Sequence, residues 1–135
     1  MKRLALFSAI SVLLLIAACT KEPPTYPPGD VTISLRVNHH GVPIPHAVIW
    51  RKNGTSIFPG RDSSLYETRY VTDSEGKFTI TDIGNGQKEM VLYAEGIDPT
   101  WDSTLTTPVW GYQLLNFYTR PGFDSLLNVT VPVSE

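Results

Sequence analysis

The chain has 135 residues, enough for one domain with a hydrophobic core, and hydrophobic residues make up 41% of it. Its 11 basic and 13 acidic residues give a formal net charge of −2 and are scattered along the sequence. Nucleic-acid binding depends on neutralising phosphates with clustered Lys and Arg, so this charge pattern argues against a nucleic-acid-binding protein.

The N-terminal stretch has the layout of a secretory signal peptide. Lys2 and Arg3 form a short basic segment, and residues 4–18 are almost wholly apolar. This run is shorter than the roughly 20 apolar residues that a transmembrane helix needs. We therefore expect residues 1–18 to be a signal peptide that takes no part in the folded domain.

The residues that end this stretch, Ile16-Ala17-Ala18-Cys19, resemble the lipobox of bacterial lipoproteins. The resemblance implies cleavage before Cys19, lipidation of its thiol and acylation of the new amino terminus with a fatty acid such as palmitate. The alternative is an ordinary signal peptide with a chance cysteine. Cys19 is the chain's one cysteine, which favours the lipobox and excludes intrachain disulfides.

The segment after Cys19 predicts a tether. Pro23-Pro24 and Pro27-Pro28 fix φ and favour extended, polyproline-like chain. At about 3.1 Å per residue, such a tether holds a folded domain up to about 30 Å from its lipid. We expect residues 19–30 to be the lipidated cysteine and its tether, and residues 31–135 to be the folded domain.

Seven segments predict short β-strands. Residues 31–37 show this most clearly, because the apolar residues at positions 31, 33, 35 and 37 alternate with polar ones. The other segments are 47–52, 66–72, 78–82, 89–94, 109–118 and 126–133. Turn signals separate them about every 8–12 residues and none has a helical period, so the sequence predicts an all-β fold, specifically a β-sandwich.

Residues 70–80 predict two strands joined by a tight turn. Asp73 suits the first turn position, because its carboxylate can accept hydrogen bonds from nearby amides. Gly76 suits the last position, where φ is positive and a Cβ would clash. This is the pattern of a type I turn followed by a glycine bulge, a common hairpin connection, and Phe78 and Ile80 then point to one face.

Three segments in order are similar to the carboxypeptidase regulatory-like domain: Gly41-Val42-Pro43-Ile44-Pro45-His46-Ala47-Val48-Ile49, then Thr72-Asp73-Ser74-Glu75-Gly76-Lys77-Phe78-Thr79-Ile80, then Met90-Val91-Leu92-Tyr93-Ala94. The resemblance covers roughly residues 31–96 and extends to residues 109–133. It implies a transthyretin-like, seven-stranded Greek-key sandwich with a non-catalytic accessory role on exported bacterial proteins, outer-membrane lipoproteins included. The stretches 54–65 and 96–108 are longer than in that family.

Histidines occur at one place in the chain, as His39, His40 and His46. If a hairpin closes there, His39 or His40 can approach His46, and neutral imidazoles at that separation can ligate zinc or copper. The alternative is a polar, solvated loop, which we prefer because no cysteine or carboxylate lies within the turn. The acidic residues elsewhere show no calcium-loop spacing. We therefore expect no metal and no cofactor.

Four aromatic residues are the candidate ligand-binding side chains: Trp101, Trp110, Tyr112 and Tyr118. The last three share parity on the predicted strand 109–118, so they should lie on one face. On an exposed face such rings can stack on sugars or pack against a partner protein. The alternative, which we prefer, is that they cover the core of the sandwich.

No catalytic constellation is evident. The sequence lacks a Gly-x-Ser-x-Gly elbow, and any Ser-His-Asp arrangement would have to use the turn histidines. We expect a non-catalytic lipoprotein, anchored in the bacterial outer membrane, with an accessory binding or assembly role toward an envelope protein. The alternatives are a glycan-binding module that uses the aromatics of 101–118, and a small metal-binding or hydrolytic protein that uses the histidine turn.

Overall fold

A computed structural model of the protein describes residues 29–83, 86–99 and 107–135. The expected signal peptide, Cys19 and nearly all of the tether lie outside these residues, as does Trp101. Among the described residues, no helix is long and apolar enough to cross a membrane.

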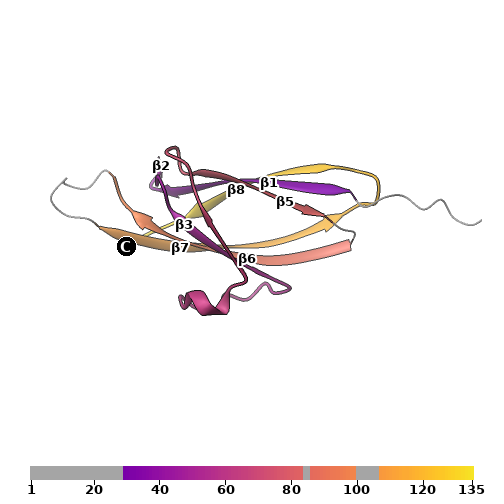
Figure 1. The fold of residues 1–135 in the computed structure, drawn as a ribbon, viewed down its shortest axis with the longest axis horizontal. Helices are drawn as coiled ribbons and strands as arrows, with labels where there is room; N and C mark the ends of the chain where they lie inside the picture. Colours follow the sequence, from indigo (N-terminus) through magenta and orange to yellow (C-terminus); the bar gives the residue numbers. More distant parts are fainter. Residues whose placement is uncertain (1–28, 84–85, 100–106) are drawn as a thin grey trace, which may run out of the picture.

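The described residues form eight β-strands and one short 3-10 helix, so the all-β prediction is confirmed (Figure 1). The elements are β1 (Asp30–His39), β2 (Val42–Pro43), β3 (Val48–Asn53), η1 (Ser63–Leu65), β4 (Thr68–Val71), β5 (Lys77–Ile83), β6 (Gly86–Ile97), β7 (Pro108–Thr119) and β8 (Ser125–Pro132). Each of the seven predicted segments overlaps an observed strand. The structure adds β2, a two-residue strand that pairs with Asn38 and His39 across a tight turn at His40-Gly41.

The strands form two four-stranded sheets, which lie over one another along the long axis of the molecule (Figure 1). In the first sheet, β1 is antiparallel to β2 and β5 along one side and parallel to β8 along the other. The second sheet has the order β4-β3-β6-β7, with every pair antiparallel. The sheet containing β8 thus brings the C-terminal strand beside the N-terminal one.

The core lies between the two sheets because alternate residues of their strands are apolar. In β1 the four predicted inward residues are all buried, and Ile80 of β5 and Val131 of β8 join them from the neighbouring strands. From the second sheet, Ile49, Met90 and Leu92 pack into the same cluster. Burying each of these side chains contributes about 1.5–3 kcal/mol relative to leaving it in water.

The strands on either side of the Asp73 turn do not pair with each other, contrary to the hairpin that the turn pattern suggests. β4 pairs with β3 in one sheet, whereas β5 pairs with β1 in the other. The local turn is nevertheless as predicted, because Gly76 N–H donates to the Asp73 carbonyl at 3.1 Å and Gly76 has φ +70°. The turn therefore carries the chain from one sheet to the other.

Side-chain and backbone contacts fix this crossing. The Asp73 carboxylate accepts hydrogen bonds from the amides of Glu75 at 2.8 Å and Lys77 at 2.9 Å. The Lys77 amide is the main cause that lowers the Asp73 pKa from its usual 3.8, since hydrogen bonds favour the charged form. Beside the turn, the Thr72 hydroxyl accepts a hydrogen bond from the Ala47 amide at 2.8 Å, and this joins the crossing to β3.

The end of the chain closes one side of the sandwich. Beyond Pro132, the chain leaves the edge of the first sheet and reaches β7 in the second. Trp110 N–H donates to the Ser134 carbonyl at 2.8 Å, and Ser134 N–H donates back to Trp110 at 2.9 Å. Gly111 permits this approach, because a Cβ built there would lie 1.9 Å from the carbonyl oxygen of Pro132.

Candidate functional site

The candidate aromatic residues of β7 lie on the outer face of the second sheet, away from the core. Val109, Leu115 and Phe117 of the same strand face inward and pack into or against the buried cluster. Tyr112 and Tyr118, at the alternate positions, are 41% and 63% exposed. The preferred interpretation that these rings cover the core between the sheets is therefore wrong.

Strand register assembles an aromatic cluster on this outer face. Tyr93 of β6 lies between Trp50 of β3 and Tyr112 of β7 in one cross-strand row. Tyr93 and Trp50 stack with ring centroids 5.4 Å apart. The irregular segment 54–67 then covers the row, with Phe58 stacked on Tyr112 at 4.2 Å and an interplanar angle of 7°. This cover leaves Tyr93 with no exposed surface.

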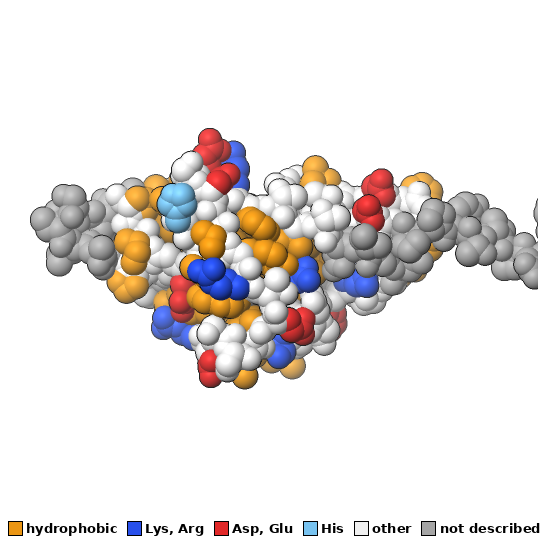
Figure 2. Space-filling model, viewed as in Figure 1, with side chains coloured by type: hydrophobic (Ala, Val, Ile, Leu, Met, Phe, Trp, Pro, Cys, Tyr) orange, Lys and Arg blue, Asp and Glu red, His pale blue; other side chains and the backbone are white. Residues whose placement is uncertain are grey.

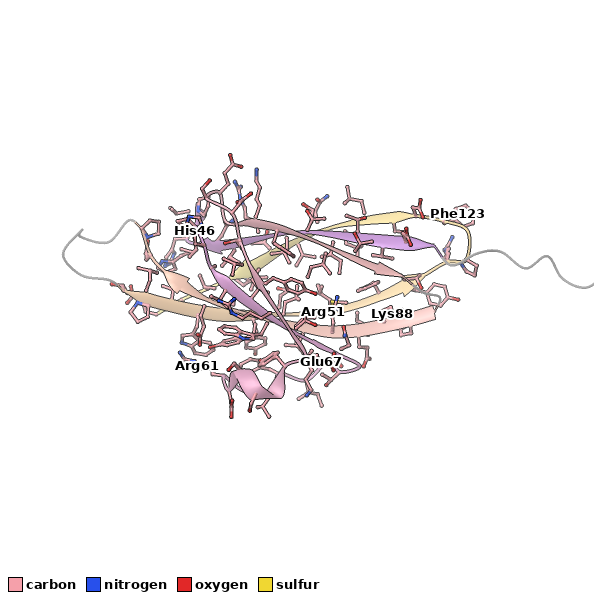
Figure 3. The ribbon with its side chains drawn as sticks, in the orientation of Figure 1. His46, Arg51, Arg61, Glu67, Lys88 and Phe123 are labelled. Carbon is pink, nitrogen blue, oxygen red and sulfur yellow. The ribbon has the colours of Figure 1, made fainter. Side chains whose placement is uncertain are left out.

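Segment 54–67 is held in place by polar contacts at its C-terminal end. Lys52 Nζ donates to the carbonyl of Leu65 at 2.8 Å, and Asn53 Nδ2 donates to the carboxylate of Glu67 at 2.7 Å. In Figure 3, Glu67 lies where the segment returns to the sheet, and Arg61 lies further out on the same side of the molecule. These contacts hold segment 54–67 against the outer face of the second sheet.

Arg61 of this segment is the centre of a polar network next to Trp110. Its guanidinium carbon lies 4.6 Å from the centroid of the Trp110 ring. Arg61 Nε donates to the Tyr93 hydroxyl at 3.2 Å, and that hydroxyl donates to a carboxylate oxygen of Glu95. Arg61 Nη2 and the same Glu95 oxygen are 3.7 Å apart, with both side chains partly exposed. Trp110 thus carries a cation over its ring and a carboxylate beside it.

Burial beside this network raises the pKa of Tyr66. Burial, and secondarily the negative charge of Glu95, raises the pKa of Tyr66 to about 12. The Tyr66 hydroxyl donates to the Gly60 carbonyl at 2.7 Å, so it needs its proton. The phenol therefore remains neutral at physiological pH and acts as a structural donor.

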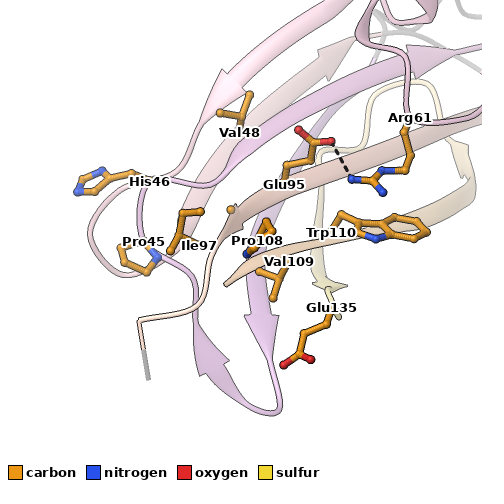
Figure 4. Close-up of a pocket in the computed structure, with 11 residues that line it drawn as sticks. Pro45, His46, Val48, Arg61, Glu95, Ile97, Pro108, Val109, Trp110 and Glu135 are labelled. Atoms are coloured by element: carbon orange, nitrogen blue, oxygen red, sulfur yellow. Dashed lines mark ion pairs between the residues drawn. The ribbon is translucent and has the colours of Figure 1, made fainter. Parts of the chain in front are cut away.

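A cleft of about 590 Å³ opens beside this network. It is lined by Pro45, His46, Val48, Arg61, Glu95, Gly96, Ile97, Pro108, Val109, Trp110 and Glu135. Arg61 and Trp110 lie at one end of the cleft, and His46 lies at the other (Figure 4). Most of the wall is apolar, and Arg61, Glu95 and Glu135 add charged groups to it, so the cleft can bind a ligand that has both an apolar part and hydrogen-bonding groups.

The three histidines differ in exposure and partners, although the rings of His39 and His40 are in contact. His39 is buried, and its Nδ1 lies 2.7 Å from a carboxylate oxygen of Asp98. His40 packs its ring 4.3 Å from that of His39, while His46 is exposed on the connection to β3. Within residues 29–83, 86–99 and 107–135, no group of three or more His, Cys, Asp or Glu side chains could hold a metal ion.

Sequence reasoning missed Tyr93, Arg61 and Phe58. One signal was available for Tyr93: residues 90–94 are all apolar or aromatic, and such an unbroken run indicates a strand that is covered on both faces. No local pattern marks Arg61 or Phe58, because their partners lie on β6 and β7 and are brought near by the fold.

Charged side chains elsewhere are spread over the visible face rather than gathered in one block (Figure 2). Positive and negative groups alternate around apolar areas on that face.

Comparisons with known proteins leave the function open. No family model matches the chain, and no curated protein matches it. Among solved structures, a similar chain is a 9R-lipoxygenase from Cyanothece PCC8801, at 19% sequence identity and a TM-score of 0.29 over 81% of this chain. The chain spans only 18% of the lipoxygenase's length. A TM-score this low carries no argument about fold or activity.

Proposed function

We propose that this protein is a non-catalytic lipoprotein of the bacterial cell envelope, anchored in the outer membrane through Cys19, whose domain binds an envelope partner. The lipobox-like Ile16-Ala17-Ala18-Cys19 after an apolar leader supports the anchor. Two or more acyl chains make such attachment stable, because each buried methylene contributes about 0.8 kcal/mol.

The strand order supports a transthyretin-like Greek-key sandwich, as in carboxypeptidase regulatory-like domains. Setting aside the two-residue β2, seven strands remain, three in one sheet and four in the other. The connections from β4 to β5, from β5 to β6 and from β7 to β8 each change sheet. Such crossings between two facing sheets are typical of Greek-key sandwiches. In this family the implied role is accessory and non-catalytic.

The observation that carries the binding role is the cleft beside Trp110. An aromatic ring, a guanidinium and a carboxylate meet at its edge, and a wall of fixed chain holds them there. Trp and Arg are the residue types that most often anchor protein interfaces, because they combine large apolar area with directed hydrogen bonds. The Arg61 and Glu95 side chains are 55% and 38% exposed, so both can still hydrogen-bond to a ligand.

The test is purification of the native, lipidated protein in mild detergent, with Trp110→Ala compared with Leu114→Ala. Leu114 lies on the outer face of the same strand at 40% exposure and serves as the matched control. We expect a stoichiometric envelope protein to accompany wild type and Leu114→Ala, and to be lost from Trp110→Ala at unchanged melting temperature. Retention by Trp110→Ala would remove the cleft from the proposal. Cys19→Ala should release the protein from membranes; continued attachment would remove the anchor.

A glycan is the second candidate ligand, because the flat Trp110 ring is flanked by side chains that can hydrogen-bond sugar hydroxyls. The same two variants decide between the candidates on a glycan array. Sugar binding that disappears in Trp110→Ala but not in Leu114→Ala would replace the protein partner with a glycan.

A further inference from the structure

Three of the most exposed large hydrophobic side chains gather at one end of the domain. Tyr118 at the end of β7, Phe123 in the following loop and Leu126 at the start of β8 are 63%, 67% and 63% exposed. Figure 3 shows Phe123 at this end of the long axis, with His46 toward the opposite end. We call the end formed by residues 118–126 the apolar tip.

The first described residue of the chain is fixed against this tip. Gly29 is buried, and a Cβ on it would lie only 2.1 Å from the carbonyl oxygen of Phe123. The next amide, that of Asp30, donates to the Asp124 carboxylate at 3.0 Å. Nine residues, 20–28, separate Cys19 from Gly29. The chain from a lipid on Cys19 to the domain therefore spans at most about 35 Å, and it arrives at the tip.

The three side chains point in different directions around the tip. Tyr118 belongs to the outer face of the second sheet, and Leu126 alternates with the core-facing Leu127 and so belongs to the outer face of the first. Phe123 lies in the loop between them. A flat protein surface can cover only one of these faces at a time. A bilayer interface into which the tip sinks surrounds all three.

Charge adds little to this preference. The described charged side chains near the tip have both signs: Arg120 and Lys88 are basic, and Asp30 and Asp124 are acidic. Attraction to anionic headgroups requires a basic cluster. Apolar and aromatic side chains instead favour the interfacial zone itself, whatever the headgroup.

We propose that the apolar tip inserts into the interface of the bilayer that holds the Cys19 lipid. The long axis of the domain then points away from the membrane plane. This rests on the proposed lipid anchor. It places the cleft toward the far end, because β6 and β7 run from the tip at Gly86 and Thr119 to the cleft at Ile97 and Pro108. Eleven residue-to-residue steps along each strand join those ends, which is about 36 Å at 3.3 Å per step.

The experiment uses the lipidated protein in zwitterionic phosphatidylcholine vesicles. A thiol-reactive NBD fluorophore is placed at the tip through Ser125→Cys, which keeps all three apolar residues, or at the cleft end through the exposed Ile97→Cys. Cys19 is the chain's only natural cysteine, so lipidated wild type should take no label. We expect the tip label to be blue-shifted and quenched by nitroxide-labelled lipid, and the label at position 97 to remain in water.

The matched control combines Ser125→Cys with Tyr118→Ser, Phe123→Ser and Leu126→Ser, and should lose the quenching while melting at an unchanged temperature. Vesicle-bound protein whose tip label remains in water would overturn tip insertion and leave the anchor intact. Equal quenching at positions 97 and 125 would also overturn it, since the domain would then lie flat. Wild type that takes label and does not bind vesicles would overturn the lipid anchor itself.

Discussion

Replacing Gly76 by alanine should destabilise the domain more than its backbone conformation alone requires. Gly76 has φ +70°, a left-handed conformation that costs residues with a Cβ about 1–2 kcal/mol. In addition, the new Cβ would lie 2.9 Å from the Ile44 carbonyl oxygen and 3.0 Å from that of Val37. Both are backbone atoms, which cannot move aside as a flexible side chain can.

Gly54 provides the matched control. Its φ is +71°, almost the same as that of Gly76, but a Cβ built on it meets nothing within 4 Å. Gly54→Ala should therefore cost only the conformational part, about 1–2 kcal/mol. Gly76→Ala adds the cost of overpacking, about 1–3 kcal/mol, for a total of about 2–5 kcal/mol.

Urea unfolding followed by circular dichroism measures both variants against wild type, with equal m-values required for the comparison. We expect the midpoint of Gly76→Ala to be clearly lower than that of Gly54→Ala. Equal losses in the two variants would contradict this expectation, because they would mean that the Asp73 turn does not pack tightly against the backbone of residues 37 and 44. No loss in either variant would refute the left-handed conformation as well.

Two further predictions concern the contact of the C-terminal segment with β7 and the protonation of Tyr66. Gly111→Ala should separate the C-terminal segment from β7 and destabilise the domain by about 3 kcal/mol, because its Cβ would lie 1.9 Å from the Pro132 carbonyl oxygen. Hydrogen exchange at the amides of Trp110 and Ser134 should become faster, and unchanged protection there would contradict the pairing of this segment with β7. Tyr66 keeps its proton in the fold up to a pKa of about 12, against an ordinary 10.0, so its contribution to stability is complete below about pH 10 and is lost as the pH rises from 10 to 12. Tyr66→Phe should unfold with a smaller dependence on pH in that window, and an identical dependence would mean that the phenol is not shielded.

The placement of the candidate site shows where sequence reasoning stops. Strand parity correctly grouped Trp110, Tyr112 and Tyr118 on one face, because successive side chains of a strand alternate. It could not say whether that face was the inner or the outer one. That choice depends on which face packs against the facing sheet, and Val109, Leu115 and Phe117 take that side. Segment 54–67, which has no periodicity of its own, then covers part of the outer face.

The partners of the histidines could not be predicted from their closeness in sequence either. Their closeness in sequence suggested a shared site, yet His39 takes Asp98 as its partner from 59 positions away. His39 ends β1 in the first sheet, whereas Asp98 follows β6 in the second. Their contact depends on how the two sheets pack against each other, and the local sequence does not contain that arrangement.

The sequence by itself determined the all-β class, the approximate position of seven strands and the local form of the Asp73–Gly76 turn. Each of these follows from interactions within a few residues: alternation decides which side chains are buried, and a carboxylate and a glycine together define the turn. The tertiary structure alone decided that this turn joins two sheets, and that Arg61, Glu95 and Trp110 meet beside a cleft. The physical reason is that a turn fixes the direction of the chain, whereas the pairing of its two strands depends on which distant strands bury the larger apolar surface.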